Sequence, residues 1–244
     1  MLIVLTIGVN RLVEASACEA TGALVQGTVG FGLNVVAAPL LVLLDPHYVP
    51  APTLMAGTLT TLGIATRDRR HLDVPSLSWA MAGRVPGTVA GTFVLLVLAR
   101  RSLGLLFGVL ILLGAGLSVL GKGISRRPSN LLWVGMLSGL MGTTASVGGP
   151  PLALLYQHEH GSRVRATLSA YGFMGTAVSL IALAAAGKVT SASFDLALTL
   201  LPGLIIGYVG SRLLAGRLSQ GWFRWAVLAV VAASAVAVIA RSIG

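Results

Sequence analysis

Two glycine-rich stretches decide the architecture of this chain: TGALVQGTVGFG at residues 21–32 and SGLMGTTASVGG at residues 138–149. They align at an offset of 117 residues, which places Gly32 opposite Gly149. A second glycine pair recurs in the same order at an offset of 120: Gly83 and Gly87 match Gly203 and Gly207. Small residues at four-residue spacing suit close helix packing. The common order and the nearly constant offset predict a duplicated chain.

Each glycine-rich stretch interrupts a long apolar run. The first run covers residues 15–44, too long for an upright helix, and the second covers residues 130–157. Gly costs about 1 kcal/mol and Pro about 3 kcal/mol in a helix interior, so residues 148–151 are not expected to form regular helix. Each run should therefore consist of two half-helices around a break. Irregular backbone at bilayer depth persists only where protein buries it or where it lines a polar cavity.

The other apolar runs have the length of membrane-spanning helices. They cover residues 50–66, 75–99, 102–121, 166–187, 194–216 and 222–241. The 244-residue chain is 55% hydrophobic and 10% charged, whereas a soluble domain carries about 25% charged residues. Continuous runs of Leu, Ala and Val favour helices over barrel strands, which would alternate with period two. The sequence predicts an all-α membrane protein with two inverted four-segment repeats, each opening with a broken or re-entrant helix.

The most polar loop, GKGISRRPSN, lies at the centre of the chain, at residues 121–130. We take it as the linker between a repeat over residues 1–121 and a repeat over residues 122–244. The formal charge of +10 fits arginines and lysines that orient helices in a bilayer. Basic residues nowhere form a patch with interleaved aromatics, so no nucleic acid partner is expected.

The positive charges favour re-entrant hairpins at the two broken runs. If every run crosses the membrane once, the two sides of the membrane hold nine and seven basic residues, and this split favours neither orientation. If both broken runs turn back, the split is eleven against five. The eleven are Arg67, Arg69, Arg70, Lys122, Arg126, Arg127, Arg163, Arg165, Arg212, Arg217 and Arg224, and the five are Arg11, Arg100, Arg101, Lys188 and Arg241. This hairpin topology places both termini in the periplasm.

Paired helix breaks are the best sequence indication of a transport site, because half-helix N-termini attract anions. The candidate substrate-binding residues of the first break are Gly27, Thr28, Gly30, Gly32 and Asn34. Those of the second break are Thr143, Thr144, Ser146, Gly148 and Gly149, with Gln157 as a weaker polar candidate. The alternative is that the glycines only let helices pack closely.

Arg84 is the one cation well inside an apolar run, about 13 Å deep at roughly 1.5 Å per residue. An intramembrane arginine marks a function by default, and here it could pair with an anionic substrate. The alternative is that its side chain snorkels to the interface.

Other polar residues carry weaker signals. The cluster His158, Glu159 and His160 is read as a solvated loop, and no metal site is expected. The lone Cys18 excludes a disulfide or a cysteine metal site within one chain. Glu19 lies near the end of its apolar run, and proton coupling through a buried carboxylate has little support at this stage. We expect no cofactor.

The two opening motifs, GTVGFGLNVVAAPLL at residues 27–41 and GTTASVGGPPLALL at residues 142–155, resemble those of the TauE/SafE (sulfite exporter) family of bacterial membrane permeases. The resemblance extends from about residue 15 to residue 241. The family's usual GGG-type run before a proline is replaced here by residues 30–34 (GFGLN), with Pro39 downstream. The resemblance implies transport of small sulfur-containing anions such as sulfite, sulfonates and sulfoacetate.

Together these features predict a secondary transporter of the bacterial inner membrane that moves a small anion, such as sulfite or an organosulfonate, by alternating access. An intramembrane enzyme would need an acid, base, nucleophile or metal set, and the apolar runs supply none, so no enzymatic activity is expected. A structural membrane subunit would need no paired breaks. The expected partners are the small anion and the lipid bilayer, and a homodimer is the alternative to a monomer.

Overall fold

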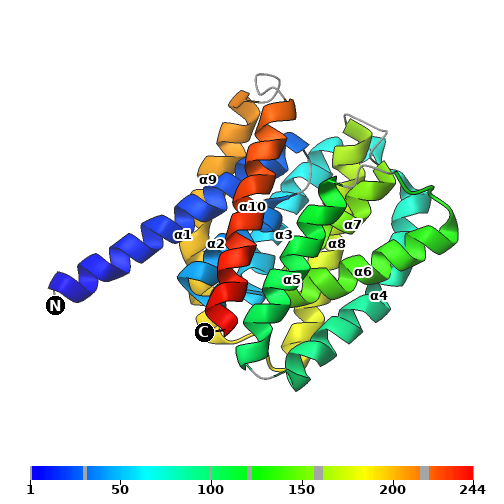
Figure 1. The fold of residues 1–244 in the computed structure, drawn as a ribbon. Helices are drawn as coiled ribbons and strands as arrows, with labels where there is room; N and C mark the ends of the chain where they lie inside the picture. The colour runs from blue at the N-terminus through cyan, green and yellow to red at the C-terminus, as the bar shows by residue number, and fades with distance from the viewer. Residues whose placement is uncertain are drawn as a thin grey trace.

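The computed structural model describes residues 2–29, 32–98, 100–119, 123–156, 162–214 and 220–243. Over these residues the regular structure is entirely helical, as the sequence predicts (Figure 1). The α-helices are α1 (Leu2–Val29), α2 (Leu33–Leu44), α3 (Ala51–Asp68), α4 (Val74–Val97), α5 (Arg100–Val119), α6 (Pro128–Ala145), α7 (Gly149–Ala153), α8 (Ser162–Ala185), α9 (Ser191–Leu214) and α10 (Gln220–Ile243). Short 3₁₀ helices are η1 (Pro46–Tyr48), η2 (Arg69–His71) and η3 (Leu154–Tyr156).

The first break forms a helical hairpin between α1 and α2. Gly32 has a φ of 112°, a left-handed conformation that glycine adopts without steric cost. The side-chain oxygen of Gln26 accepts a hydrogen bond from the backbone N–H of Leu33 at 3.0 Å, which fixes the start of α2. A side chain on Gly22 would collide with the carbonyl oxygen of Leu33. The two helices therefore pack closely and antiparallel, around a break at the predicted position.

The second break forms a hairpin between α6 and the α7–η3 segment. Ser146 ends α6 with a φ of 61°. The chain then turns back toward the start of α6. The carbonyl of Leu154 accepts a hydrogen bond from the N–H of Ile124, just before α6, at 3.2 Å. The prediction that residues 148–151 are all non-helical is wrong, since α7 already begins at Gly149. Its two prolines occupy the first helical turn, where a missing N–H costs nothing and the fixed φ of proline suits the helix.

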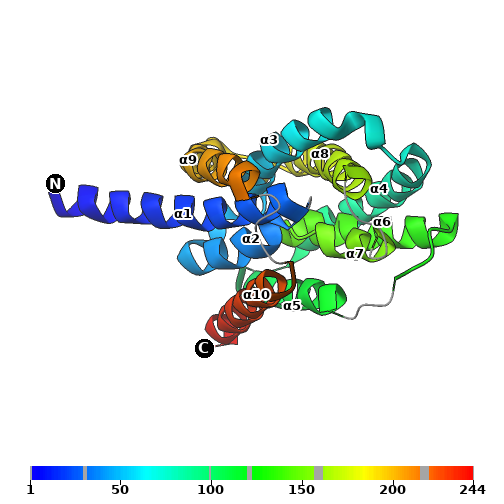
Figure 2. The same ribbon diagram turned by 90° about the horizontal axis from the view of Figure 1, so that it is seen from above.

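The helices form three layers (Figure 2). The two hairpins make up the middle layer. Helices α9, α3 and α8 cover one face of it, with α4 at the edge, and α5 and α10 cover the other face. The N-terminal part of α1 projects from the bundle (Figure 1). The site described below therefore lies inside the bundle, next to the turns of the middle layer.

Helix α4 crosses α6 through glycines. A side chain on Gly83 would collide with the carbonyl group of Leu132, and one on Gly87 with that of Met136. Two backbones can approach this closely only where small residues meet. The predicted role of these glycines in helix packing is confirmed.

Helix α9 crosses α1 in the same manner. A side chain on Gly203 would collide with the carbonyl group of Ser16, and one on Gly207 with that of Ala20. The glycine pairs that the sequence aligns thus lie in two similar crossings, each between a long helix and the first arm of a hairpin.

One end of the bundle holds a network of ion pairs. Asp73 contacts Arg126 at 3.1 Å and Arg163 at 3.4 Å, and Asp68 pairs with Arg165. Burial alone would raise the pKa of Asp73, but hydrogen bonds from Ser76 and the nearby arginines hold that pKa below its ordinary value. The network joins the end of α3 and the segments before α4 and α6 to the first turn of α8.

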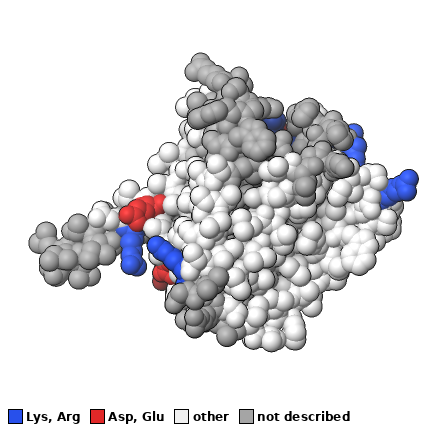
Figure 3. Space-filling view, viewed as in Figure 1, with Lys and Arg blue, Asp and Glu red and all other residues white. Residues whose placement is uncertain are grey.

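The sides of the bundle are apolar. Exposed side chains on α4 include Val85, Val89 and Phe93, which follow one another at helical spacing. The face seen in Figure 3 is almost free of charged residues, apart from a few near its edge. Among the described residues, three helices are long and apolar enough to cross a membrane: Val74–Val97, Ser162–Ala185 and Ser191–Leu213.

The predicted apolar runs agree with the helices except at the beginning. Helix α1 starts at Leu2, whereas the first run was predicted from residue 15. The helix continues through Arg11 and Glu14, which are exposed and so need no apolar surroundings. The predicted apolar run therefore covers the C-terminal part of α1 and not its full length.

Candidate functional site

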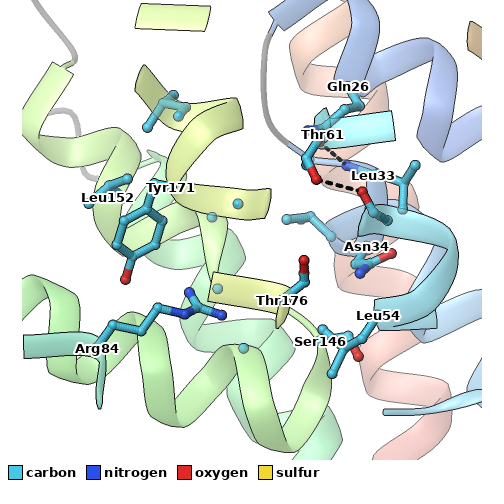
Figure 4. Close-up of a pocket in the computed structure, with 18 residues that line it drawn as sticks. Gln26, Leu33, Asn34, Leu54, Thr61, Arg84, Ser146, Leu152, Tyr171 and Thr176 are labelled. Atoms are coloured by element: carbon cyan, nitrogen blue, oxygen red, sulfur yellow. Dashed lines mark hydrogen bonds between the residues drawn. The ribbon is translucent and has the colours of Figure 1, made fainter. Parts of the chain in front are cut away.

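A cavity of about 80 Å³ lies between the turns of the two hairpins (Figure 4). Gly32, Leu33 and Asn34 line it from the first hairpin, and Ser146 and Gly148 from the second. Helices α3, α4 and α8 complete its walls. At roughly 10–15 Å³ of such space for each water, the cavity has room for about six water molecules. It therefore suits a small ion with some bound water.

Arg84 extends into this cavity from α4 (Figure 4). Its residue exposure is 3%, and it lies ten residues from the start of α4 and thirteen from its end. At about 1.5 Å per residue, it is at least roughly 15 Å from either end of the helix. The alternative that Arg84 snorkels to an interface is therefore wrong for this structure.

Among the residues that the structure describes, the guanidinium of Arg84 has only neutral partners. Its Nη1 donates to the hydroxyl of Ser138 at 3.3 Å, and its Nη2 donates to the hydroxyl of Ser179 at 3.4 Å. Its Cζ lies 5.0 Å from the ring centre of Tyr171, within cation–π range. Its Nε is buried without a hydrogen-bond partner, and none of the described acidic residues pairs with it. A buried cation without a counter-ion favours an anionic ligand.

Glycines make room for this guanidinium. A Cβ on Gly142 would lie 2.9 Å from Nη2, and one on Gly148 would lie 3.2 Å from Nη1. A Cβ on Gly175 would collide with Nε and Cζ. These three glycines come from α6, the second break and α8. The Arg84 side chain is thus enclosed on several sides and held in one orientation.

The opposite wall carries neutral polar groups: Gln26, Asn34, Thr61 and, between the walls, Thr176 (Figure 4). Asn34 donates from Nδ2 to the carbonyl of Thr53 at 3.4 Å, while its Oδ1 has no partner. Turning this amide over would present its NH₂ group where Oδ1 now lies. The wall can thus add uncharged hydrogen bonds to the charge of Arg84.

A second, larger cleft of about 1270 Å³ opens at the end of the bundle opposite the ion-pair network. Its walls include His47, Lys188 and Arg241. The segment from Val49 to Pro52 lines the cleft, whereas Leu54 and Ser146 line the cavity.

A hydrogen-bonded layer separates the cleft from the cavity. The hydroxyls of Thr53 and Ser146 are 2.8 Å apart and lie 2.9 and 3.1 Å from the carbonyl oxygen of Pro50, so one hydroxyl donates to the other and the second donates to this carbonyl. The left-handed backbone of Ser146 directs its hydroxyl into this layer. The cavity is therefore closed toward the cleft by a few side chains.

The structure brings six of the predicted site residues to the cavity: Gly32, Asn34, Arg84, Ser146, Gly148 and Gly149. Three others lie outside it. Gly27 packs against Ser211 of α9, and Thr144 donates to the carbonyl of Leu140 in its own helix. Thr143 bonds the hydroxyl of Ser179 at 2.8 Å and so contacts the cavity only through a partner of Arg84.

The remaining predicted residues cannot be compared with the cavity. Gly30 and Gln157 lie outside the described residues, as does the cluster at residues 158–160, and of Thr28 only the backbone is described. Gln26, Tyr171 and Thr176 line the cavity but were not predicted. No glycine pattern pointed to Tyr171, because the neighbouring glycines 172 and 175 are three residues apart, whereas the packing glycines of α4 and α9 are four apart.

The described polar groups that line the cavity are hydrogen-bonding groups. Among the described residues, no group of three or more His, Cys, Asp or Glu side chains could hold a metal ion. Within the cavity, the polar groups are one guanidinium, amides, hydroxyls and backbone groups. Their shared property is the ability to donate hydrogen bonds to oxygen atoms.

Comparison with known proteins gives one result. The family model described as Sulfite exporter TauE/SafE matches residues 16–238, nearly the whole chain. No curated protein and no solved structure matches the chain.

Proposed function

The chain belongs to the sulfite exporter TauE/SafE family, and we propose that it is a multi-pass secondary transporter of the bacterial inner membrane for a small sulfur oxyanion, such as sulfite or an organosulfonate. The observation that carries this proposal is Arg84, a buried cation without an acidic partner among the described residues, in a cavity between two helix breaks. A bound oxyanion would supply the missing counter-charge.

The form of the site supports an oxyanion as substrate. A guanidinium presents a planar fork of donors that matches the oxygens of sulfite or a sulfonate better than a spherical halide. The Nε of Arg84 has no partner, and the hydroxyl of Thr176 lies nearby on the cavity wall. The volume of about 80 Å³ suits an anion of a few heavy atoms. A larger organosulfonate would need its organic group to extend toward Leu54 or Leu152.

The packing supports two inverted repeats, over residues 1–121 and 122–244. If each helix is replaced by its counterpart in the other half, the packing of α4 on α6 becomes the packing of α9 on α1. The same replacement maps the contact of α3 with α8, and that of α5 with α10, onto itself. The α1–α2 hairpin starts and ends toward the cleft, whereas the α6–α7 hairpin starts and ends toward the ion-pair network. Three long helices follow each hairpin. This arrangement is typical of transporters whose site lies between the repeats.

The same arrangement supports alternating access. The cleft leads toward the cavity from one end, and the Thr53–Ser146 layer closes it. Ion pairs of Asp73 and Asp68 join the segments at the other end. Rocking one repeat against the other would open one closure as the second forms. With the basic residues divided as in the hairpin topology, the ion-pair end faces the cytoplasm.

Transport in proteoliposomes tests the proposal. Sulfite, a small alkanesulfonate and chloride are each offered to purified protein, and uptake is measured by counterflow. We expect uptake of sulfite or the sulfonate but not of chloride. Arg84→Ala should weaken uptake by about 30-fold or more, since truncating a buried charged partner costs about 2–5 kcal/mol. Arg84→Lys should recover part of it, since lysine keeps the charge but not the fork.

Arg69→Ala is the matched control, because Arg69 is exposed and lies in η2, away from the cavity. It should transport like the parent. Full uptake by correctly inserted Arg84→Ala protein, or no uptake of any sulfur oxyanion by the parent, would refute the proposed function.

A further inference from the structure

A second ionisable group is buried in the bundle, apart from the cavity. Glu19 in α1 has no exposed surface, and both of its carboxyl oxygens lack a hydrogen-bond partner. None of the described basic residues forms an ion pair with it. Glu19 does not line the cavity, so the proposed anion site does not account for it.

The surroundings of Glu19 are apolar. Ala15 and Ala23, one turn on either side, are fully buried in a cluster with Leu41, Ala56 and Leu200 from α2, α3 and α9. Residues four apart share a helix face, so the Glu19 side chain points into the same cluster. A carboxylate in such surroundings would cost several kcal/mol, whereas a neutral carboxyl costs far less. Glu19 therefore carries a proton in this conformation.

The depth of Glu19 matches the middle of a membrane-spanning helix. The turn of α1 that carries it packs on Gly203 and Gly207 of α9, through Ser16 and Ala20. Gly203 lies twelve residues from the start of α9 and eleven from its end, so roughly 17 Å of helix extends on either side. A group at this depth exchanges protons with water only along a polar path or after a conformational change.

A polar path leads from this turn toward the cleft. The hydroxyl of Ser16, one turn before Glu19, donates to the carbonyl of Thr199 at 2.8 Å. The hydroxyl of Tyr48 is 3.1 Å from that of Thr199, and the neighbouring His47 lines the cleft. These polar groups lie between the Glu19 turn and the cleft.

In the other direction, α1 connects Glu19 to the cavity. Gln26, two turns after Glu19, lines the cavity and accepts the hydrogen bond of Leu33 that fixes the hairpin turn. A shift of α1 on loss of the Glu19 proton would therefore move a wall of the anion site. Two sites that bias the same moving element are coupled reciprocally.

We propose that Glu19 is the proton-binding site that couples anion transport to a proton gradient. This inference rests on the proposed function as an anion transporter. In the cycle, Glu19 releases its proton to water while α1 exposes it on one side of the membrane, and it takes a proton from water on the other side. No covalent bond other than the O–H bond of the carboxyl forms or breaks.

Other titratable groups near Glu19 do not explain its burial. Glu14 and Cys18 lie on its own helix, and α2 has no titratable side chain. Tyr48 faces the cluster from η1. On α3 these groups are Arg67 and Asp68 at its far end, and on α9 they are Asp195 at the cleft and Tyr208 and Arg212 toward the opposite end.

The test compares Glu19→Gln with the parent in proteoliposomes that contain a pH-sensitive dye, with sulfite as the probe. In the parent, a sulfite gradient should move protons, and a pH gradient should drive sulfite accumulation. Glu19→Gln should lose both responses but keep sulfite counterflow within about threefold, because its amide resembles the neutral carboxyl. Glu14→Gln, an exposed carboxyl on the same helix, should behave like the parent.

Sulfite transport by the parent without proton movement, or unchanged coupling in Glu19→Gln, would overturn the proposal. Failure of Glu19→Gln to insert, when Glu14→Gln inserts, would also overturn the proposal. A neutral amide should replace a protonated carboxyl without harm, so this failure would indicate that Glu19 is charged. If the parent transports no sulfite, the proposed substrate fails, and infrared spectroscopy decides on Glu19 without substrate. A protonated carboxyl band at neutral pH that is missing only in Glu19→Gln supports the proposal, and its absence from the parent overturns it.

Discussion

Gly175→Ala should disturb the anion site without removing any charged or polar group. A methyl group at this position would occupy the space of Arg84 Nε and Cζ, and it would lie 2.8 Å from Arg84 Cδ. The guanidinium must then move away from Ser138 and Ser179, its hydrogen-bond partners. Hydrogen bonds to charged groups contribute about 1.5–3 kcal/mol. We therefore expect sulfite to bind about 10–100-fold more weakly, at about 1.4 kcal/mol for each factor of ten.

The free energy of unfolding gives a second readout that needs no ligand. Overpacking costs about 1–3 kcal/mol, whereas Ala in place of Gly in a helix gains about 1 kcal/mol. In the parent, Gly175→Ala should therefore be neutral or destabilising by up to about 2 kcal/mol. In an Arg84→Ala background the obstacle is absent, and the same change should stabilise by up to about 1 kcal/mol. Such non-additivity is the signature of two residues in contact.

Binding is measured by calorimetry on monodisperse protein in detergent, and stability by thermal unfolding, where 1 kcal/mol corresponds to about 2–4 °C for a chain of this size. Gly116→Ala is the matched control, because Gly116 is also helical and a Cβ there meets nothing within 4 Å. It should stabilise both backgrounds slightly and leave affinity unchanged. Equal effects of Gly175→Ala in both backgrounds would refute the contact with Arg84, and normal affinity in the parent background would refute the role of the guanidinium in binding.

Three further predictions concern other parts of the molecule. Reporter fusions to the C-terminus should show alkaline phosphatase activity and no cytoplasmic fluorescence, and the opposite result would contradict the hairpin topology. Asp73→Asn should lower the unfolding temperature by an amount corresponding to about 1–3 kcal/mol, through loss of charge-assisted hydrogen bonds. The pKa of Asp73 is lowered in the folded chain. The contribution of its carboxylate to stability is therefore present above about pH 3.9 and is lost as pH falls through the folded pKa. Between about pH 6 and pH 3, the unfolding temperature of the parent should fall more steeply than that of Asp73→Asn. Ser146→Gly keeps the left-handed backbone but removes the hydroxyl that contacts Thr53. In a Cys18→Ala background, this change should speed the reaction of a thiol reagent with a cysteine introduced by Thr176→Cys. An unchanged rate would contradict closure of the cavity by the Thr53–Ser146 layer.

The sequence predicted the positions of the breaks because glycine and proline act locally. Gly32 and Ser146 mark the turns of the hairpins, where left-handed backbone is required. The same local rule misjudged the start of α7, because the effect of proline depends on its position in the helix. Periodicity and composition alone do not tell which residue will occupy a first helical turn.

The lining of the cavity was harder to predict because it depends on contacts between distant segments. Gly27 lies close to the first break, yet its neighbour is Ser211 on α9, so its role is packing. Tyr171 and Thr176 reach the cavity because α8 packs on both α3 and α4. The two readings of Arg84, substrate contact and snorkelling, differ only in where the side chain points. That direction is set by glycines on α6 and α8, more than fifty residues away.

The two similar crossings carry different residues, and this difference can give a symmetric scaffold a single site. In the α4–α6 crossing the buried charge is Arg84, whereas the residue 120 positions later, on α9, is Leu204 in an apolar cluster. A second arginine there would place two like charges inside one small bundle, and the apolar Leu204 avoids this. The α1–α9 crossing instead carries Glu19 among the alanines and leucines around Leu204. Under the proposed repeat and the two proposed sites, one crossing would bind the anion and the other the proton, and both meet at the hairpin that holds Gln26. Because α1 carries Glu19 and also contributes Gln26 to the wall of the cavity, movement of this one helix would link the two proposed sites.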